Sequence, residues 1–498
     1  MENLGQLPRF RGVATCKSWL DRPLSSFWCV LGWLGASTIF VGLIALLGGP
    51  SESDGAASVF STWAEAHGNF SCAYPPASSF KFPLTGPLYP LVSAGFSRLL
   101  RIGHGVAFPT QHQLGRNCSR AFLAISHWAV LSGSWLPMVR LGYLSWFALM
   151  AGLIAILRAT GRGRCGWEPA ILVLVACIPS VFASILVYFH PQDILAMGLA
   201  LVGVAFARRN CWLRAGIVLA LAVCSQQFTI LVLTPLIIIA PSSQRWKFLG
   251  ALVATAALID IPLFIESSGR AATAIFGGTG FSGALGDTLI DNIGIHGTLL
   301  TVASRACPII VTIGLAWWAK RKIGAASLEP VPLLSLIATA LCSRLLFEVD
   351  LWGYYFLAVS VALVVLDAAS GKIRGTLIAW LALVTLVFNP VIWSTTTTGQ
   401  SSGIHLYRSV PIIFITLMML CIIADVLHRK IRWYRVVWIL LVFYTTLVGG
   451  WINDPAGHGF PMWIWQIVLI SAAIALSVNP LMSTARHSSR DESVREVS

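Results

Sequence analysis

Charged residues are scarce in this sequence: Asp, Glu, Lys and Arg make up 11% of the 498 residues, whereas 56% are hydrophobic. A soluble domain carries roughly 25% charged residues, so this composition excludes a water-soluble globular fold. In lipid the backbone must satisfy its own hydrogen bonds, which leaves only helices or a closed barrel. Apolar runs such as 28–47 and 409–423 are too long and too continuous for the alternating strands of a barrel.

Acidic residues are few as well, because 20 Asp and Glu stand against 34 Lys and Arg, for a formal net charge of +14. No zinc-finger, RRM or helix-turn-helix pattern accompanies this charge, so no nucleic-acid partner is expected. The basic residues gather instead in short loops between apolar runs, which is the bias of cytoplasmic loops in membrane proteins. No Cys and His residues cluster at the spacing of metal ligands, so no metal site is assigned.

The apolar runs predict an all-α, polytopic integral membrane bundle of about 12–14 transmembrane helices. No cleavable signal peptide is evident, and the basic segment 1–27 is expected to be a cytoplasmic tail. Residues 28–482 form the predicted transmembrane domain, and the polar segment 483–498 is expected to be a disordered cytoplasmic tail. The predicted spans lie near 28–47, 136–158, 169–189, 193–207, 213–239, 248–265, 300–319, 330–347, 350–367, 375–394, 409–427, 434–451 and 461–482.

The segment 48–135 is predicted to be a long first extracytoplasmic loop. It contains two short apolar stretches, 84–100 and 121–135. They are either amphipathic helices that lie on the membrane surface or two extra spans. Both alternatives leave the sidedness of all later segments unchanged.

Charge placement tests the number of spans. Three runs between Arg214 and Lys320 would put these two basic sites on opposite sides of the membrane, against the positive-inside bias. The run 213–239 is longer than one span needs and is interrupted at Ser225-Gln226-Gln227. Two short helices that meet at the outer surface near Gln226 restore the parity. The alternative is one long tilted helix together with a missed segment in the glycine-rich stretch 271–286.

Polar residues that could carry chemistry collect on the predicted outer face. Glu52 and Asp54 follow the first span, and His190, Gln192 and Asp193 precede the fourth. Carboxylates at span ends are costly to bury and are often functional, although capping a helix N-terminus is an equally available role. The remaining members of this group are Gln226 and Gln227, at the predicted helix break, and Arg344, Glu348 and Asp350.

The order of these pieces resembles a known family. Glu52-Ser-Asp54 is followed by Cys-Ala-Tyr-Pro-Pro at 72–76, then by His190-Pro-Gln-Asp193-Ile-Leu-Ala-Met-Gly-Leu, and then by Ser225-Gln226-Gln227 and Leu233-Thr-Pro235. This pattern, over roughly 45–245, is similar to that of polyprenyl-phosphate-sugar-dependent membrane glycosyltransferases of the GT-C superfamily, especially the bacterial mannosyltransferase-like branch. The rest of the chain matches only in being a series of spans.

The resemblance implies a GT-C-like fold in the plasma (cell) membrane and transfer of mannose or a similar sugar. The donor would be a polyprenyl-phosphate sugar, and the acceptor an extracytoplasmic lipid or glycan. Asp54 matches the catalytic base of the first outer loop, with Glu52 in reserve. A positioned carboxylate takes the proton of the acceptor hydroxyl, and the leaving phosphate needs cationic or hydrogen-bonding partners. The expected substrate-binding residues are Glu52, His190, Gln192, Asp193, Gln226, Gln227, Arg344 and Glu348.

One departure from the family pattern concerns the phosphate. Related sequences often place a Lys at the helix break, where this chain has Gln226 and Gln227. Arg344, Arg305, His190 or Arg140 would have to supply the missing charge. Arg344 has a structural alternative, an ion pair with Glu348 one helical turn later.

The same features leave other functions open. The broken helix and the intramembrane Asp260 are also typical of a transporter or a lipid-linked sugar flippase. The glutamine pair also fits a non-catalytic membrane assembly protein. The Glu-x-Asp pairs at 52–54 and 348–350 leave a divalent cation open as a cofactor.

Overall fold

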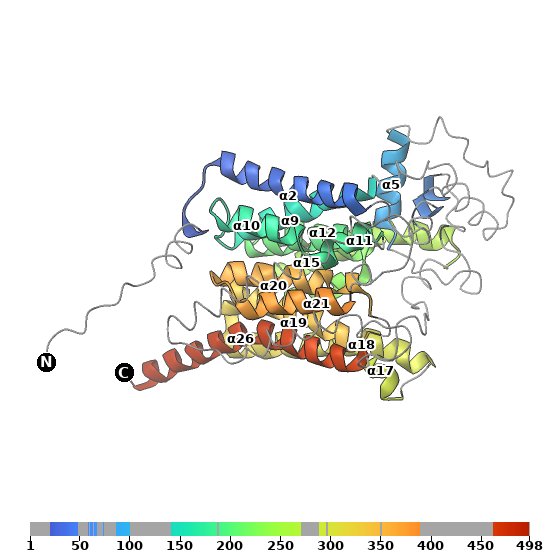
Figure 1. The fold of residues 1–498 in the computed structure, drawn as a ribbon. Coiled ribbons are helices and arrows are strands. Elements are labelled where there is room, and N and C mark those ends of the chain that lie inside the picture. The colour runs from blue at the N-terminus through green and yellow to red at the C-terminus, as the bar shows by residue number, and fades with distance from the viewer. Residues whose placement is uncertain are drawn as a thin grey trace, which may run out of the picture.

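The computed structural model describes residues 20–47, 86–99, 141–186, 189–269, 288–294, 297–348, 351–388 and 462–497, and the single positions or short stretches 58, 60–62, 64–66 and 73. Within these residues the structure is helical and contains no strand, apart from one isolated bridge between Pro23 and Cys165. The helices run side by side in one bundle (Figure 1).

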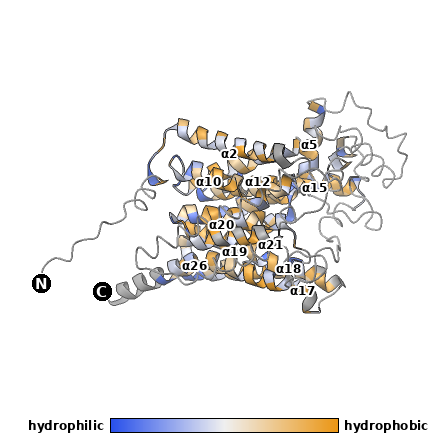
Figure 2. Cartoon of the chain, viewed as in Figure 1, coloured by the Kyte–Doolittle hydropathy of each residue, from blue (hydrophilic) through white to orange (hydrophobic). Residues whose placement is uncertain are grey.

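Seven helices in the described residues are long and apolar enough to cross a membrane. Hydrophobic residues are frequent along the helices of the bundle (Figure 2). The chain is therefore an all-α, multi-pass membrane protein, as predicted. These seven spans belong to α2 (Ser26–Leu47), α9 (Ser145–Ala159), α12 (Pro191–Arg208), α15 (Ser242–Glu266), α18 (Gly297–Ile323), α20 (Phe356–Ser370) and α26 (Met462–Val497).

Two of the shorter helices in the bundle are α19 (Pro330–Leu346) and α21 (Gly375–Phe388). Very short helical segments are α17 (Leu289–Asn292), η2 (Gly324–Leu328) and η3 (Gly353–Tyr355). The predicted spans 409–427 and 434–451 lie outside the described residues. The total of 12–14 spans therefore stays a prediction.

The predicted span 169–189 is two helices rather than one. α10 (Trp167–Ala176) and α11 (Pro179–Leu186) meet at a bend of 56°. Proline has no backbone N–H to donate and its ring crowds the preceding turn, so Pro179 starts a new helix instead of continuing α10. The bend was not predicted, although the two helices together are long and apolar enough to form one broken span.

The predicted break in 213–239 is confirmed. α13 (Trp212–Ser225) ends at Gln226, whose backbone is extended (φ −156°, ψ 135°), and the chain resumes as η1 (Gln227–Thr229) and α14 (Ile230–Ile239). Trp212 packs on Phe248 of α15 near one end of the bundle, while Gln226 reaches the first turn of α12 at the other. The alternative of one long tilted helix is therefore excluded.

Several basic side chains meet at one end of the bundle. Arg245 and Lys320 both donate to the carbonyl oxygen of Ile238, and Arg208 donates to that of Leu328. This shared end agrees with the parity that the broken helix restores. We call it the basic end, and the positive-inside bias predicts that it faces the cytoplasm.

Two further contacts extend the basic end across the bundle. Gly371, which ends α20, lies against the Arg162 guanidinium. Arg374 pairs with Asp367 and donates to the carbonyl of Leu476 in α26. The opposite end carries His190, Asp193, Gln226, Arg344 and Glu348, and we call it the polar end.

α5 (Leu88–Leu99) lies at the polar end and has only 12 residues, which is too short to cross a bilayer (Figure 1). One face is buried, whereas Val92, Phe96 and Leu99 are exposed. The spacing of these three residues puts them on one side of the helix. Of the two alternatives for 84–100, the structure therefore favours a helix on the membrane surface. The stretch 121–135 lies outside the described residues.

α26 differs from its prediction at its C-terminal end. The polar segment 483–498, expected to be disordered from its composition, continues the helix as far as Val497. Adding residues to an existing helix avoids the cost of nucleation, so a polar segment can extend a helix that is anchored by an apolar one. The expectation of disorder is therefore not met over these residues.

Candidate functional site

The start of α12 places three polar residues at the polar end. Pro191 occupies the first helical turn, where its missing N–H costs nothing, and His190 precedes it. Asp193 lies in the same turn, where the helix dipole favours a negative charge. His190, Gln192 and Asp193 are all buried, with 5%, 2% and 5% of their surface exposed. Buried polar groups need partners, so their contacts decide what the site can do.

His190 is held from two sides. Its ring stacks on Tyr354 with 4.1 Å between the ring centroids and 18° between the planes. The amide Nε2 of Gln192 lies 2.9 Å from His190 Nδ1, and Asp193 Oδ2 lies 3.9 Å from the same atom. A hydrogen bond therefore joins the side chains of Gln192 and His190. The ring is therefore oriented by its neighbours on α12.

The helix break is tied directly to α12. Gln226 donates from Nε2 to Asp193 Oδ1, and its Oε1 accepts from the backbone N–H of Gln227. Ser225 Oγ donates to the carbonyl oxygen of Gln192 at 3.0 Å. The extended backbone at Gln226 thus directs its side chain towards the carboxylate of Asp193. The side chains of Gln226 and Asp193, together with the Ser225 hydroxyl, therefore link the end of α13 to the start of α12.

Arg344 approaches this network from α19. Its Nε donates to Glu348 Oε2 at 2.7 Å, and both side chains are largely buried, at 18% and 11% exposed. The guanidinium carbon lies 5.0 Å from the ring centroid of Tyr355 and 5.6 Å from that of Phe228. The structural alternative for Arg344, an ion pair with Glu348, is therefore observed.

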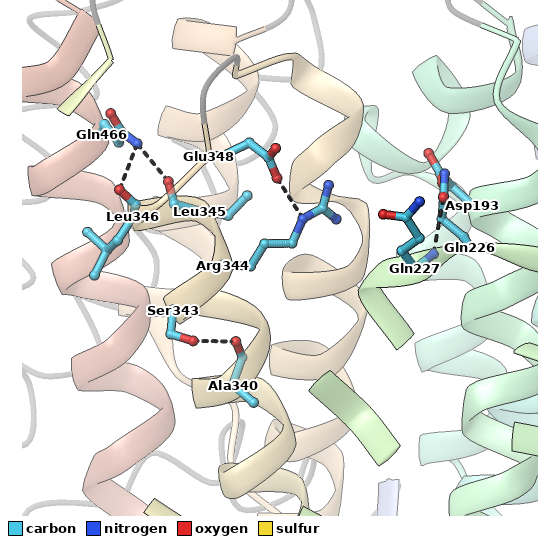
Figure 3. Close-up of polar contacts among 10 residues, drawn as sticks. All are labelled: Asp193, Gln226, Gln227, Ala340, Ser343, Arg344, Leu345, Leu346, Glu348 and Gln466. Atoms are coloured by element: carbon cyan, nitrogen blue, oxygen red, sulfur yellow. Dashed lines mark hydrogen bonds and ion pairs between the residues drawn. The ribbon is translucent and has the colours of Figure 1, made fainter. Parts of the chain in front are cut away.

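The ion pair does not isolate Arg344 from the rest of the site. Arg344 and Asp193 are close enough to interact electrostatically. Figure 3 shows Gln227 between Arg344 on one side and the Gln226–Asp193 pair on the other. The sequence-predicted residues of three separate segments therefore converge.

The arrangement offers donors and acceptors that the described residues leave unused. Arg344 binds Glu348 through Nε, and within the described residues its two Nη groups make no hydrogen bond. Gln192 Oε1 is buried and likewise has no partner there. A guanidinium fork can bind a phosphate through two hydrogen bonds, and an amide oxygen can accept from a hydroxyl. The site therefore suits a ligand that carries both an anion and hydroxyl groups.

The first outer loop is described only in part. Glu52, Asp54 and Asp350 lie outside the described residues, so their positions remain predictions. Tyr89, in α5, forms side-chain hydrogen bonds with Ser58 and Ser93, and burial raises the pKa of Tyr89 to about 12. The phenol therefore stays neutral at physiological pH and keeps its proton for hydrogen bonding.

The start of α5 is fixed against the helix break. A Cβ at Gly86 would collide with the carbonyls of Cys224 and Ser225, so only glycine allows this close approach. Because Tyr89 follows within one turn and bonds with Ser58, the described part of the first loop lies at the same end as His190.

Three aromatic residues and one amide of the site were not predicted. Tyr354, Tyr355 and Phe228 form its walls, and Gln466 is fully buried beside it. Gln466 Nε2 donates to the carbonyl of Leu345, and its Oε1 accepts from the N–H of Leu289. The signal for Gln466 was an amide side chain inside the apolar run 461–482.

Two other candidates lie apart from this network. Asp260 of α15 accepts a hydrogen bond from Cys224 Sγ at 3.6 Å, and its Oδ1 is buried without a partner among the described residues. Arg305 is exposed on α18, and Arg140 lies outside the described residues. In the part of the chain that the structure describes, no group of three or more His, Cys, Asp or Glu residues could hold a metal ion.

No model of a known protein family matches the chain, and no curated protein sequence is similar enough to it to count as a match. The likeness to GT-C glycosyltransferases therefore rests on the order of the residues given above.

Proposed function

We propose that this protein is a membrane glycosyltransferase. It would transfer a sugar, mannose or similar, from a polyprenyl-phosphate donor to a lipid or glycan acceptor on the extracytoplasmic side. One observation carries the proposal. Arg344, Gln226, Asp193 and His190 meet at the polar end of a membrane bundle, opposite the basic end.

Arg344 is the group we assign to the donor phosphate. A polyprenyl monophosphate leaves as an anion, and preorganised donors that face the developing charge lower the barrier. The Nη groups of Arg344 and the amide of Gln227 would supply these donors. They would replace the Lys that related sequences place at the helix break. Glu348 positions the guanidinium by its bond to Nε.

Asp54 is the proposed catalytic base, with Glu52 in reserve. The acceptor oxygen forms a bond to the anomeric carbon while the bond from that carbon to the phosphate oxygen breaks. The hydroxyl proton passes to the Asp54 carboxylate, and the leaving electron pair stays on the phosphate. His190, Gln192 and Asp193 would bind sugar hydroxyls, since Gln192 Oε1 is an unused acceptor. A divalent cation remains open as a cofactor through Glu52 and Asp54.

The test is transfer from radiolabelled polyprenyl-phosphate mannose in membranes that contain the protein. Asp54→Asn should lower the rate about 100- to 10,000-fold, the usual contribution of a general base. Glu266→Gln is the matched control, because this carboxylate is exposed at the end of α15. Equal rates for wild type and Asp54→Asn would remove Asp54 from the role of base. Absence of transfer from any polyprenyl-phosphate sugar by the wild type would reject the proposal.

A second candidate function is transport of a lipid-linked sugar. It draws on the broken helix pair and on Asp260, whose Oδ1 is buried without a described partner. Intramembrane carboxyls of this kind are frequent on transport pathways. Movement of a lipid-linked sugar across proteoliposomes without any glycosyl transfer would favour this function. Partner binding that survives loss of both Asp54 and His190, with neither activity detected, would favour a non-catalytic assembly protein.

A further inference from the structure

Two cations converge on one carbonyl oxygen at the basic end. Arg245, in the first turn of α15, donates from Nη2 to the carbonyls of Ile238 and Ala240 at 3.3 and 3.1 Å. Lys320, in the last turn of α18, donates from Nζ to the same Ile238 carbonyl. Both side chains therefore lie at the C-terminal end of α14, although they come from two different helices that follow it in the sequence.

The charge of this pair is not neutralised by the described residues. Lys320 and Arg245 are close enough to repel each other. Within the described part of the chain, neither forms an ion pair with a carboxylate, and Arg245 Nε is buried without a partner. The end of a helix offers about half a negative charge, which is less than the two positive charges placed there.

Other arginines at the same end show the contrast. Arg158 pairs with Glu168, Arg162 with Asp21 and Arg374 with Asp367. At those places the chain supplies its own anion. At the end of α14 the described chain does not, so an anion from outside is expected.

The surroundings of the pair indicate where that anion comes from. Trp246, next to Arg245, is 79% exposed, and Trp317, one turn before Lys320, is 51% exposed. Exposed tryptophans at the ends of spans mark the boundary between lipid and water. Further along both helices, large apolar side chains are exposed on the surface of the bundle. They are Val253, Leu258 and Ile261 on α15, and Val302, Ile310 and Ile313 on α18. A ligand here would have its head at the cations and its tails against lipid-facing helices.

We propose that Arg245 and Lys320 bind the phosphate of an anionic phospholipid from the leaflet at the basic end. The acyl chains lie along the exposed apolar side chains of α15 and α18. The Arg321 guanidinium, stacked on Trp317 at 3.7 Å from the ring centroid, adds a further positive charge beside the headgroup. Basic pockets between membrane helices recognise anionic headgroups in this way. The proposal is independent of the sugar-transfer function.

The test uses the full-length protein in detergent and a titration with phosphatidylglycerol, read by native mass spectrometry and by the shift of Tm. A cation near an anionic lipid surface contributes about a fivefold gain in affinity, so Arg245→Gln with Lys320→Gln should weaken binding about 30-fold. Arg209→Gln with Arg214→Gln is the matched control. Both of these residues are exposed at the same end, and the variant loses the same two charges. It should bind as tightly as the wild type.

Each alternative gives a different result. Equal binding by the site variant and the control variant would overturn the proposal, because any two charges would then serve. An equal response to phosphatidylcholine would exclude recognition of a net negative headgroup. An equal Tm shift with inorganic phosphate would mean that the site takes a free anion rather than a lipid. If the double variant does not fold, Arg245→Lys with Lys320→Arg keeps both charges and should retain binding, whereas Lys320→Gln alone should lose about fivefold.

Discussion

The two ends of the bundle treat their charged groups differently. At the basic end the unused groups are donors: Arg208 Nε, Arg245 Nε and Arg374 Nη2 are buried without partners among the described residues. At the polar end the unused groups are of both kinds: the acceptors Gln192 Oε1 and Asp260 Oδ1, and the two Nη groups of Arg344, which make no hydrogen bond within the described residues. The basic end is therefore arranged to receive anions alone, whereas the polar end can receive a ligand that carries both an anion and hydroxyl groups.

The difference extends to how ions are paired. At the basic end carboxylates are paired with arginines: Arg162–Asp21 joins short connections between helices and lies partly in water, whereas Arg374–Asp367 is largely buried. At the polar end, Asp193 is held by an amide and a histidine, and Arg344 is held by Glu348 between aromatic rings. Exposed pairs contribute little stability, whereas a buried charge is costly when its partner is removed. The polar end thus keeps a costly arrangement, which is expected of a functional site.

The largest expected effect follows from breaking the buried pair. Arg344→Gln leaves Glu348 buried without its partner, and should lower the free energy of unfolding by about 3–5 kcal/mol. Arg344→Gln combined with Glu348→Gln removes both charges and should recover most of that loss. Denaturant titration in mixed micelles measures both. A double variant as unstable as the single one would show that the ion pair is not the cause.

A smaller effect is expected for the bidentate pair at the basic end. Glu168 is 1% exposed and accepts from Nε and Nη2 of Arg158, and also from the backbone N–H of Arg164. Arg158→Gln should cost about 1.5–3 kcal/mol, because Arg164 still supplies one hydrogen bond. The same titration applies. If Arg158→Gln lowered the free energy of unfolding as much as Arg344→Gln, the two ion pairs would be equally costly to break and the expected difference between them would be absent.

The smallest effect is expected for the exposed pair. Arg162 and Asp21 are 28% and 40% exposed, and Trp167 Nε1 also donates to Asp21. Arg162→Gln should change the free energy of unfolding by about 0.2–1 kcal/mol, and less at high salt. A change above 2 kcal/mol, measured at two salt concentrations, would mean that this connection is structurally as important as the polar end.

Much of the fold follows from two patterns in the sequence. Apolar runs locate the spans because a bilayer fixes their length, and the side on which basic loops lie fixes their parity. That parity located the break at Gln226 before any contact was known. The bend at Pro179 was missed, although proline was its signal. The helical end of α26 was missed because composition says little about a segment that an anchored helix can extend.

The site was predicted in part. His190, Gln192 and Asp193 form one helix start, and Arg344 and Glu348 are one turn apart, so local spacing brings each group together. That α19 packs against α14, and so brings Arg344 to Phe228 and near Asp193, is a tertiary contact, which spacing along the chain does not encode. Tyr354, Tyr355 and Phe228 were missed because aromatic residues are abundant throughout, with 25 Phe and 20 Trp in the chain. The role of Asp54 stays a prediction.

The account depends most directly on the polar end facing away from the cytoplasm. Single cysteines at the two ends of α15 test this, as Glu266→Cys and Ser243→Cys in a background without the native cysteines. Both positions are exposed. In intact cells, a membrane-impermeant maleimide should label Glu266→Cys and should reach Ser243→Cys only after the cells are permeabilised. The opposite labelling would place the site in the cytoplasm and contradict the proposed transfer to an extracytoplasmic acceptor.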